Sequence, residues 1–293
     1  MEPVPFDKRS GKIWFNGKPI NWADVKIHVL SHGLHYASCV FEGERVYDGR
    51  IFKLEEHTDR LFHSAERLGF KIPYSKEELN SYCKNIVEIQ KVKNGYVRPV
   101  VWRGSEMMAI SAQKTKIHVA IAAWEWGSYF DPNLKLKGIK LNISKWRRPA
   151  PNTIPWDTKA SGLYMICTLS KHEAEKDGFT DSLMLDYQDN IAEATGANIF
   201  FKNSEGEIHT PIPDSFLDGI TRRCIIELAK SKNIKVIERK IKPEELSKFV
   251  GCFLTGTAAE VTPVSQIDKY KFTVCNIIKD LSESYQDLVR KKI

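Results

Sequence analysis

The pattern of hydrophobic and polar positions in the first third of the chain is that of short strands joined by tight turns. Asn16-Gly17 separates two apolar runs in IWFNGKPINW, and Asp48-Gly49 separates two more in VFEGERVYDGRIFKL. Asn-Gly and Asp-Gly dipeptides between apolar runs are typical of two-residue β-hairpins. KIHVL, at residues 26–30, also has the pattern of a strand. We therefore predict two hairpins and one further strand here.

Helical periodicity then replaces the strand pattern. Apolar residues recur at helical spacing from Leu54 to Leu68, and Gly69 supplies a stop signal. A second helix is predicted from Lys76 to Lys91. Its inward side chains are predicted to be Leu79, Tyr82, Cys83, Ile86 and Val87. Two strand-like runs follow, YVRPVVW and KIHVAIAAW.

The pattern breaks at Asp131-Pro132-Asn133 and Gly138, which predicts a linker. Beyond it, helices are predicted over Ala160–Asp177, over Ile220–Lys232 and from about Cys275. The predicted strands are IKLNIS, SLMLD, KVIERK and CFLTG, together with a hairpin in ANIFFKNSEGEIHTP. Mixed strands and helices with early hairpins indicate an α+β protein of two domains. We predict a small N-terminal domain at 1–128, an interdomain loop at 129–138 and a larger domain at 139–293.

Composition narrows the class of protein. The chain has 293 residues, of which 42% are hydrophobic and 28% charged, as in ordinary globular proteins. It has no apolar run of membrane-spanning length and no signal-peptide pattern, so we expect a cytoplasmic protein without a membrane partner. The six cysteines form no CxxC pair, which favours reduced thiols.

The net charge of +7 leaves one alternative class, a basic nucleic-acid-binding protein. The lysines and arginines are spread along the chain with only short clusters such as KVK, WRR and TRR. A weakly basic enzyme that handles small anions fits equally well, and we do not expect nucleic acid as a partner.

Three histidines, His28, His32 and His35, have a spacing that would align them on a helix as metal ligands. Because KIHVL reads as a strand and Gly33 interrupts the remainder, we interpret them as hydrogen-bonded histidines in a packed turn. No metal is expected.

Two turns could bind an anion. In DGITRR the backbone N–H groups of Gly219, Ile220 and Thr221 would open a helix, and LTGTAAE adds the Thr257 hydroxyl beside small residues. The alternative for each is a capped helix start or a tight turn. Lys159 in PWDTKASGLY is either a solvated side chain or a buried amine with a chemical role, and a lone acid such as Glu193 in NIAEATGANIF is usually solvated. An amine, a carboxylate and a phosphate cradle together are the groups that pyridoxal phosphate requires.

The ordered segments SHGLHYASCVFEG, YVRPVV, APNTIP, EATGANIFF, DGITRR and LTGTAAEVTPV extend this hypothesis. In order and composition they resemble the fold-type IV pyridoxal phosphate enzymes, and among them the branched-chain amino acid aminotransferases. The likeness runs from about Ile13 to Asp268. It implies a fold-type IV architecture and pyridoxal 5′-phosphate as the cofactor.

The resemblance assigns cofactor roles residue by residue. Lys159 is implied to be the lysine that forms an imine with the cofactor and also moves a proton, and Glu193 to face the pyridine nitrogen. Tyr164 is implied to hydrogen-bond the phenolic oxygen. The phosphate would be bound by Arg60, Ile220, Thr221 and Thr257.

The resemblance also implies a substrate pocket. Its apolar walls would be Phe41, Trp126, Tyr129 and Tyr164, although Trp126 and Tyr129 could instead belong to an apolar core. Arg98, supported by Tyr96, would meet the side-chain carboxylate of glutamate, and the Thr257-Ala258 backbone would hold the α-carboxylate. Tyr36 and the WRGSEMMAIS loop resemble segments that reach the neighbouring subunit's site, which implies a homodimer or a higher homo-oligomer.

The implied activity belongs to branched-chain amino acid biosynthesis. The amino group of leucine, isoleucine or valine would pass to 2-oxoglutarate by a ping-pong cycle through pyridoxamine phosphate. The alternatives on the same fold are a D-amino acid or (R)-amine transaminase and aminodeoxychorismate lyase.

Overall fold

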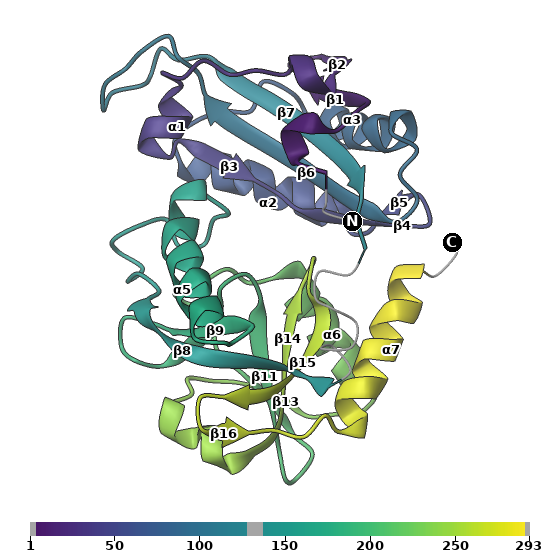
Figure 1. Cartoon of the computed structure of the whole chain (residues 1–293), viewed down its shortest axis with the longest axis vertical. Coiled ribbons are helices and arrows are strands. Elements are labelled where there is room, and N and C mark those ends of the chain that lie inside the picture. The colour runs from purple at the N-terminus through teal and green to yellow at the C-terminus, as the bar shows by residue number, and fades with distance from the viewer. Residues whose placement is uncertain (1–3, 128–136, 291–293) are drawn as a thin grey trace. The chain divides into compact units, whose positions relative to one another are not determined.

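The computed structural model describes residues 4–127 and 137–290 (Figure 1). The described chain divides into two compact units. The first unit contains the residues up to Gly127 together with Thr158–Gly162, and the second contains the rest. Most of the predicted interdomain loop, including Tyr129, lies outside the described residues, and the domain boundaries at 128 and 139 stay a prediction.

The first unit is built on a seven-stranded sheet in the order β2-β1-β7-β6-β4-β5, with β3 paired to β6. All of its strand pairs are antiparallel. Its strands are β1 Lys12–Phe15, β2 Lys18–Asn21, β3 Cys39–Phe41, β4 Glu44–Tyr47, β5 Arg50–Ile51, β6 Gly95–Arg103 and β7 Ile117–Glu125. Its helices are η1 Phe6–Lys8, η2 Trp22–Asp24, α1 His32–Tyr36, α2 Leu54–Arg67 and α3 Lys76–Ile89.

Both predicted hairpins of the first unit are confirmed. β1 pairs with β2 around Asn16-Gly17, and β4 pairs with β5 around Asp48-Gly49. Both residues of each turn have positive φ, at 47° and 101° in the first and 50° and 79° in the second. This is the turn geometry that matches the twist of paired strands and that Asn, Asp and Gly tolerate best.

The two long helices of the first unit also confirm the prediction. α2 ends before Gly69, whose φ of 72° stops the helix. α3 starts at Ser75, whose hydroxyl accepts from the Glu78 N–H while the Glu78 carboxylate accepts from the Ser75 N–H. Leu79, Ile86 and further apolar side chains line the inner face, and α3 packs on β1, β6 and β7.

The second unit contains a nine-stranded sheet in which six strands form a closed ring. The ring runs β10-β9-β8-β15-β14-β11, and β11 returns to pair with β10. The strands are β8 Ile139–Arg147, β9 Asp181–Leu185, β10 Ile191–Ala194, β11 Asn198–Asn203, β12 Ile208–Thr210, β13 Val236–Glu238, β14 Phe249–Gly256, β15 Glu260–Ile267 and β16 Tyr270–Lys271. The helices are η3 Ser161–Tyr164, α5 Met165–Lys176, α6 Ile220–Ser231, η4 Pro243–Lys248 and α7 Asn276–Arg290.

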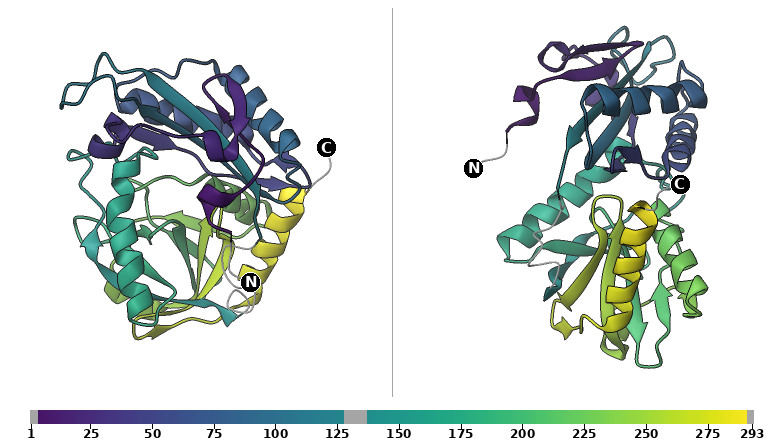
Figure 2. Two further views of the ribbon diagram at one scale, coloured as in Figure 1. Left: turned by 45° about the horizontal axis from the view of Figure 1, so that its top comes forward. Right: turned by 90° about the vertical axis from the view of Figure 1, so that its right-hand side faces the viewer.

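Alternate residues of the ring strands form one apolar core, which includes Leu141, Leu183, Ile199, Leu254 and Val264. The helices pack on the outside: α5 contacts β8 and β9, and α7 contacts β14 and β15. In Figure 2 the yellow helix α7 lies along the yellow-green strands in both views. The predicted hairpin of β11 and β12 and the three predicted helices are present. β10 and β15 were not predicted.

The prediction of a strand at KIHVL is wrong. Residues 26–28 have no regular structure and residues 29–30 form a turn before α1 begins at His32. The His28 ring nitrogen accepts from the Leu30 N–H, and the Ser31 hydroxyl donates to the His28 carbonyl. These local side-chain contacts offer the backbone an alternative to a strand ladder.

The prediction that a helix begins at Ala160 is also wrong. Ala160 forms an isolated β-bridge with Val40, and the neighbouring Phe41 N–H donates to the Lys159 carbonyl. These contacts hold Lys159 and Ala160 beside β3 in extended backbone. Ser161–Tyr164 is a 3₁₀ turn, and the α-helix starts only at Met165.

Candidate functional site

Lys159 lies in the first unit against β3 and α2. Its backbone N–H donates to the Ser64 hydroxyl of α2, 3.0 Å away. Its Nζ lies 5.0 Å from the centre of the Phe41 ring. Burial lowers the pKa of the amine to about 8; Arg60 and Arg98 act in the same direction, and the Glu42 carboxylate opposes them. Lys159 is therefore not a solvated surface lysine, and its amine becomes neutral at a lower pH than that of an ordinary lysine.

Glu42 is the centre of a buried charged cluster beside Lys159. Arg60 binds it with two nitrogens, Nε to Oε1 at 2.6 Å and Nη2 to Oε2 at 2.9 Å. His57 Nδ1 lies 2.7 Å from Oε2. Burial alone would raise the pKa of Glu42, but the charge of Arg60 and the hydrogen bond with His57 outweigh it and hold the pKa well below its usual range. The carboxylate is thus ionised, and His57 donates to it.

We call Glu42, His57, Arg60 and Lys159 the lysine cluster. His57 is buried, and that burial lowers its pKa despite the bond to Glu42, so the imidazole is neutral at physiological pH. Of the four, only Arg60 and Lys159 were predicted as site residues from the sequence. The signal for Glu42 was present in FEGE, where an acid follows a strand of apolar residues, but only packing against α2 pairs it with Arg60.

A second acid, Glu44, follows Glu42 two positions later on β4. Its side chain is completely buried, and neither carboxylate oxygen has a hydrogen-bond partner. Burial and the nearby Glu42 carboxylate raise the pKa of Glu44 well above its usual range. Glu44 is therefore a neutral acid beside an ionised one.

Several predicted substrate residues gather near Lys159. The Arg98 guanidinium lies 4.7 Å from the Phe41 ring centre and 5.3 Å from that of Tyr96, so Phe41 contacts both cations. Tyr96 meets Trp126 edge-on, with ring centres 4.8 Å apart. The structure thus brings Phe41, Tyr96, Arg98 and Trp126 together in the first unit.

Tyr36 has a different setting from these four. It ends α1 and is 41% exposed. Four apolar side chains nearby in sequence are also exposed: Ile27, Val29, Leu30 and Leu34. Met108 and Ile110 are exposed as well. They belong to a loop whose Ala109 carbonyl hydrogen-bonds His32 Nε2.

In the second unit Glu193 lies on β10, where it is only 8% exposed. Its Oε1 faces Arg148 Nε at 3.4 Å, and its Oε2 accepts from Asn198 Nδ2 at 3.3 Å. Arg148 is itself buried, and its Nη1 donates to the Leu163 carbonyl and to Cys167 Sγ. Neither Arg148 nor Asn198 was predicted to contact Glu193. Arg148 was visible only as part of the WRR cluster, and Asn198 lies within the quoted segment EATGANIFF.

The start of α6 carries the predicted anion-binding residues Ile220 and Thr221 at its first two positions, and both are buried. One part of this prediction is wrong: the Gly219 N–H is not available to an anion, because it donates to Asn198 Oδ1 at 3.1 Å. The first-turn N–H groups of Ile220 and Thr221 have no preceding carbonyl within the helix. Free first-turn N–H groups at the positive end of a helix dipole are the kind of groups that favour an anion.

Thr257 and Ala258 occupy the turn that joins β14 to β15. At its base, a Cβ added to Gly256 would lie 3.3 Å from the Gly196 carbonyl, so this turn packs closely against the one that joins β10 to β11. Tyr164 is the residue before α5 and is partly buried. Tyr129 lies outside the described residues.

The three histidines each hydrogen-bond the backbone nearby, His32 to the Ala109 carbonyl and His35 to the Val29 carbonyl, with His28 as described above. Within residues 4–127 and 137–290, no three metal-ligating side chains come together. No helix in that part of the chain has the length and apolarity needed to cross a bilayer.

Comparison with known proteins identifies the family. The model of the amino-transferase class IV family matches residues 39–267. A probable branched-chain-amino-acid aminotransferase of Rickettsia bellii is 43% identical over 95% of this chain and 96% of its own. The branched-chain-amino-acid aminotransferase of Pseudomonas aeruginosa is 39% identical over 97% and 94%.

Among solved structures, the T.th. branched-chain amino acid aminotransferase complexed with N-(5′-phosphopyridoxyl)-L-glutamate superposes with a TM-score of 0.91. It is 35% identical, over 96% of this chain and 95% of its own. The chain belongs to the class IV aminotransferases. The α+β, fold-type IV prediction and the resemblance to branched-chain aminotransferases are confirmed.

Proposed function

We propose that the chain transfers the amino group of leucine, isoleucine or valine to 2-oxoglutarate, with pyridoxal 5′-phosphate as its cofactor. The observation that carries this proposal is the Lys159 amine, whose pKa is lowered to about 8 in a chain similar over nearly its whole length to branched-chain aminotransferases. A structural relative was solved with a phosphopyridoxyl-glutamate compound, which supports both the cofactor and glutamate as the partner amino acid.

The donor set fits this cofactor. An aldehyde requires a neutral amine, which Lys159 supplies near neutral pH. A basic ring nitrogen requires an ionised acid, and Glu193 is held between Arg148 and Asn198. A phosphate requires N–H donors, and α6 begins with two. In addition, the buried Thr255 hydroxyl has no hydrogen-bond partner and lies in the same cross-strand row as Glu193.

The chemistry divides between the cofactor and the chain's own residues. When bound, pyridoxal phosphate supplies an electron-withdrawing ring that lets the substrate Cα lose its proton and carries the amino group between the two half-reactions. The neutral Lys159 amine would take the proton from the Cα of the amino donor in the first half-reaction, and its protonated form would deliver a proton to the Cα of the new amino acid in the second. Glu193 keeps a proton on the ring nitrogen. Arg60 and the first turn of α6 bind the phosphate.

The substrate pocket must accept an apolar side chain and a carboxylate in turn. Phe41 and Trp126 offer apolar contact, and by the family resemblance we also assign Tyr129 and Tyr164 to the substrate pocket. Arg98 is set against two aromatic rings by cation–π contacts, and its guanidinium is the group that would pair with the carboxylate of glutamate. We assign the α-carboxylate to the Thr257-Ala258 backbone.

The working unit is proposed to be a homodimer in the cytoplasm. Exposed apolar side chains gather around Tyr36, among them Val29, Leu34 and Ile110, and Ile110 is 82% exposed. Such a patch is typical of a surface covered in an oligomer. Tyr36 and the 102–111 loop would then serve the partner subunit's site.

The test is a panel of amino donors with 2-oxoglutarate as acceptor, in which glutamate formation is measured. We expect L-leucine, L-isoleucine and L-valine to be the fastest donors, and L-leucine alone to convert the absorption of the bound cofactor to that of pyridoxamine phosphate. Faster turnover of D-leucine or of an (R)-amine would identify the enzyme as the corresponding transaminase. Pyruvate release from aminodeoxychorismate at a higher rate would identify a lyase.

A further inference from the structure

Asn198 lies in a row of three polar side chains across the ring of strands in the second unit. It is paired with Glu193 of β10 on one side and with Thr255 of β14 on the other. Residues directly opposite one another on paired strands share a face. Asn198 and Thr255 alternate with the core residues Ile199 and Leu254, so this row faces away from the apolar core.

The Asn198 amide uses both of its ends. Its Nδ2 donates to Glu193 Oε2 at 3.3 Å and to the Leu217 carbonyl at 2.9 Å. Its Oδ1 accepts from the Gly219 N–H at 3.1 Å. A Cβ at position 219 would lie 2.2 Å from this oxygen, so the contact requires glycine there. One buried side chain thus joins the carboxylate of β10 to the backbone that leads into α6.

These contacts fix two groups that address opposite ends of the proposed cofactor. Glu193 faces the ring nitrogen, and the first turn of α6 binds the phosphate. Arg148 holds the second oxygen of Glu193. The ion pair with Arg148 keeps a positive charge beside the Glu193 carboxylate. The Asn198 amide instead donates on one side and accepts on the other, so it sets the distance between its two partners.

We infer that Asn198 is a positioning residue that sets the Glu193 carboxylate and the first turn of α6 at the spacing one cofactor molecule requires. This inference rests on the proposed function, because it uses the cofactor as the shared ligand. It predicts that loss of the Asn198 amide disturbs the ring end and the phosphate end together.

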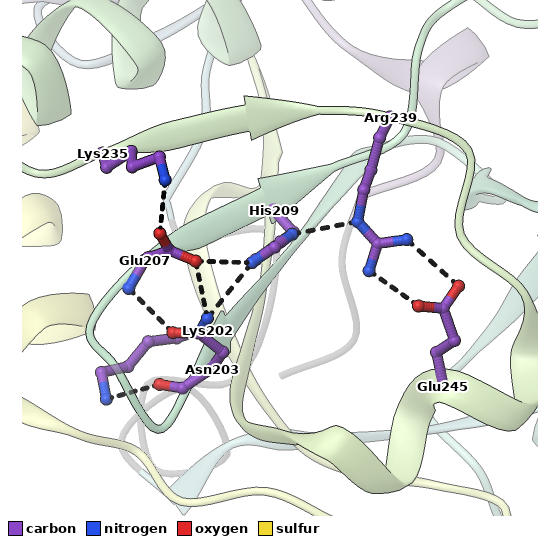
Figure 3. A network of polar contacts seen from close by, with 7 residues as sticks. All are labelled: Lys202, Asn203, Glu207, His209, Lys235, Arg239 and Glu245. Atoms are coloured by element: carbon purple, nitrogen blue, oxygen red, sulfur yellow. Dashed lines mark hydrogen bonds and ion pairs between the residues drawn. The ribbon is translucent and has the colours of Figure 1, made fainter.

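The chain offers a matched control on the same strand. Asn203, at the other end of β11, also donates to a glutamate and accepts from a backbone N–H: its Nδ2 lies 2.9 Å from Glu207 Oε2, and its Oδ1 2.9 Å from the Glu207 nitrogen (Figure 3). The surrounding network of His209, Lys235, Arg239 and Glu245 contains neither Glu193 nor α6 (Figure 3). Asn203→Ala therefore loses the same kinds of bond without touching the proposed cofactor residues.

The experiment compares the full-length wild type with Asn198→Ala, Asn198→Asp and Asn203→Ala in two assays. The first measures inorganic phosphate binding to the apoenzyme by its competition with pyridoxal phosphate. The second measures the pH midpoint of the visible absorption of the bound cofactor. If Glu193 is displaced, the pyridine ring of the cofactor carries less positive charge. The nitrogen conjugated with that ring then holds its proton more tightly, so its pKa rises and the midpoint rises with it.

We expect Asn198→Ala to weaken phosphate binding by about tenfold, because this is the effect of losing a hydrogen bond that orders charged or dipolar groups. We also expect this variant to raise the midpoint of the cofactor absorption. Asn198→Asp keeps an acceptor for Gly219 but cannot donate to Glu193, so its midpoint should also rise. It is isosteric and remains informative if the alanine variant does not fold. Asn203→Ala should leave both measurements at wild-type values.

Two outcomes overturn the inference: unchanged midpoints in both Asn198 variants, or equal changes in Asn198→Ala and Asn203→Ala. Neither outcome touches the proposed function, which depends on the amino donors of the wild type. Conversely, a wild type that binds the cofactor but prefers another donor would refute the proposed substrate and leave the test of Asn198 intact.

Discussion

The lysine cluster of the first unit and the surroundings of Glu193 in the second unit stabilise ionised groups in different ways. In the lysine cluster, Glu42 is balanced by Arg60 and His57, and these neighbours shift one another's pKa values. Glu193 faces the guanidinium of Arg148 and accepts from the amide of Asn198. The first arrangement tunes protonation, whereas the second fixes position.

This difference suits the two roles proposed for Lys159 and Glu193. A lysine that must be neutral to react needs a pKa near the working pH, and burial provides it, with Arg60 and Arg98 acting in the same direction and Glu42 opposing them. A carboxylate that must only stay ionised and aimed at a ring nitrogen needs rigid partners, and strand register provides them. Substitutions in the lysine cluster should therefore change pH dependence, while substitutions around Glu193 should change geometry.

The largest effect is expected for Lys159→Ala, which removes the only proposed proton carrier. We expect kcat to fall by about 10³-fold or more, the range for loss of a positioned proton-transfer group. The fold should persist, because the removed amine is a buried cation beside Arg60 and Arg98. Steady-state glutamate formation measures the fall in kcat, and thermal unfolding measures whether the fold persists.

Lys145→Ala is the matched control for that variant. Lys145 is an exposed lysine whose Nζ pairs with Glu173 at 2.8 Å. Exposed pairs contribute little, so this substitution should leave turnover unchanged. Appreciable transamination by Lys159→Ala would contradict the proposed role of Lys159. An unfolded Lys159→Ala protein would contradict the expectation that the fold persists without the buried amine.

The second effect is a shift in the pKa of Lys159 in Glu42→Gln. The Glu42 carboxylate favours the charged amine, and Gln cannot, so the pKa should fall below the wild-type value of about 8. The variant should also lose about 3 kcal/mol of unfolding free energy, because Arg60 would keep a buried charge without its partner. Acetylation of the apoenzyme across pH, read at Lys159 by mass spectrometry, gives the midpoint, and denaturant unfolding gives the stability.

Glu173→Gln serves as the control for Glu42→Gln, since it removes the same charge from an exposed lysine pair. Its Lys159 midpoint should match the wild type. Labelling of the exposed Lys279 in each sample corrects for the pH dependence of the reagent. A midpoint that rises in Glu42→Gln would show that the lysine cluster does not act electrostatically on the amine.

Sequence alone predicted those features whose signals are local. The hairpins at Asn16-Gly17 and Asp48-Gly49 depend on two residues each, and α2 and α3 on periodicity and their stops. The start of α5 was misplaced because a bridge from Ala160 to the distant Val40 decides it. β10, which carries Glu193, has small residues and a nearby glycine, and only its partners β9 and β11 make it a strand.

The candidate site divides in the same way. Lys159, Glu193 and the start of α6 were named from motifs, but the residues that tune or aim them were not. Glu42 meets Arg60 across 18 positions of sequence, and Asn198 meets Gly219 across 21. Such pairs are created by packing and register, which no local pattern encodes.

The smallest expected effects concern two buried acids, Glu44 in the first unit and Asp181 in the second. Both are buried acids whose pKa is raised by burial. Glu44, in the first unit, has no hydrogen-bond partner for either oxygen. Asp181, in the second, accepts from the Thr195 hydroxyl at 2.6 Å and from the Ser182 N–H at 2.8 Å. An unpartnered acid should gain from neutral replacement, and a partnered one should lose.

We therefore expect Glu44→Gln to stabilise the protein and Asp181→Asn to destabilise it, each by about 1 kcal/mol at neutral pH. Because the pKa of Glu44 is higher in the folded than in the unfolded chain, the fold binds the extra proton, and wild-type stability falls as pH rises above the unfolded pKa. Gln does not titrate, so the advantage of Glu44→Gln should grow from acid to neutral pH. Urea unfolding of both variants between about pH 5 and about pH 8 measures this; a constant difference across that range would mean that Glu44 is already ionised in the fold.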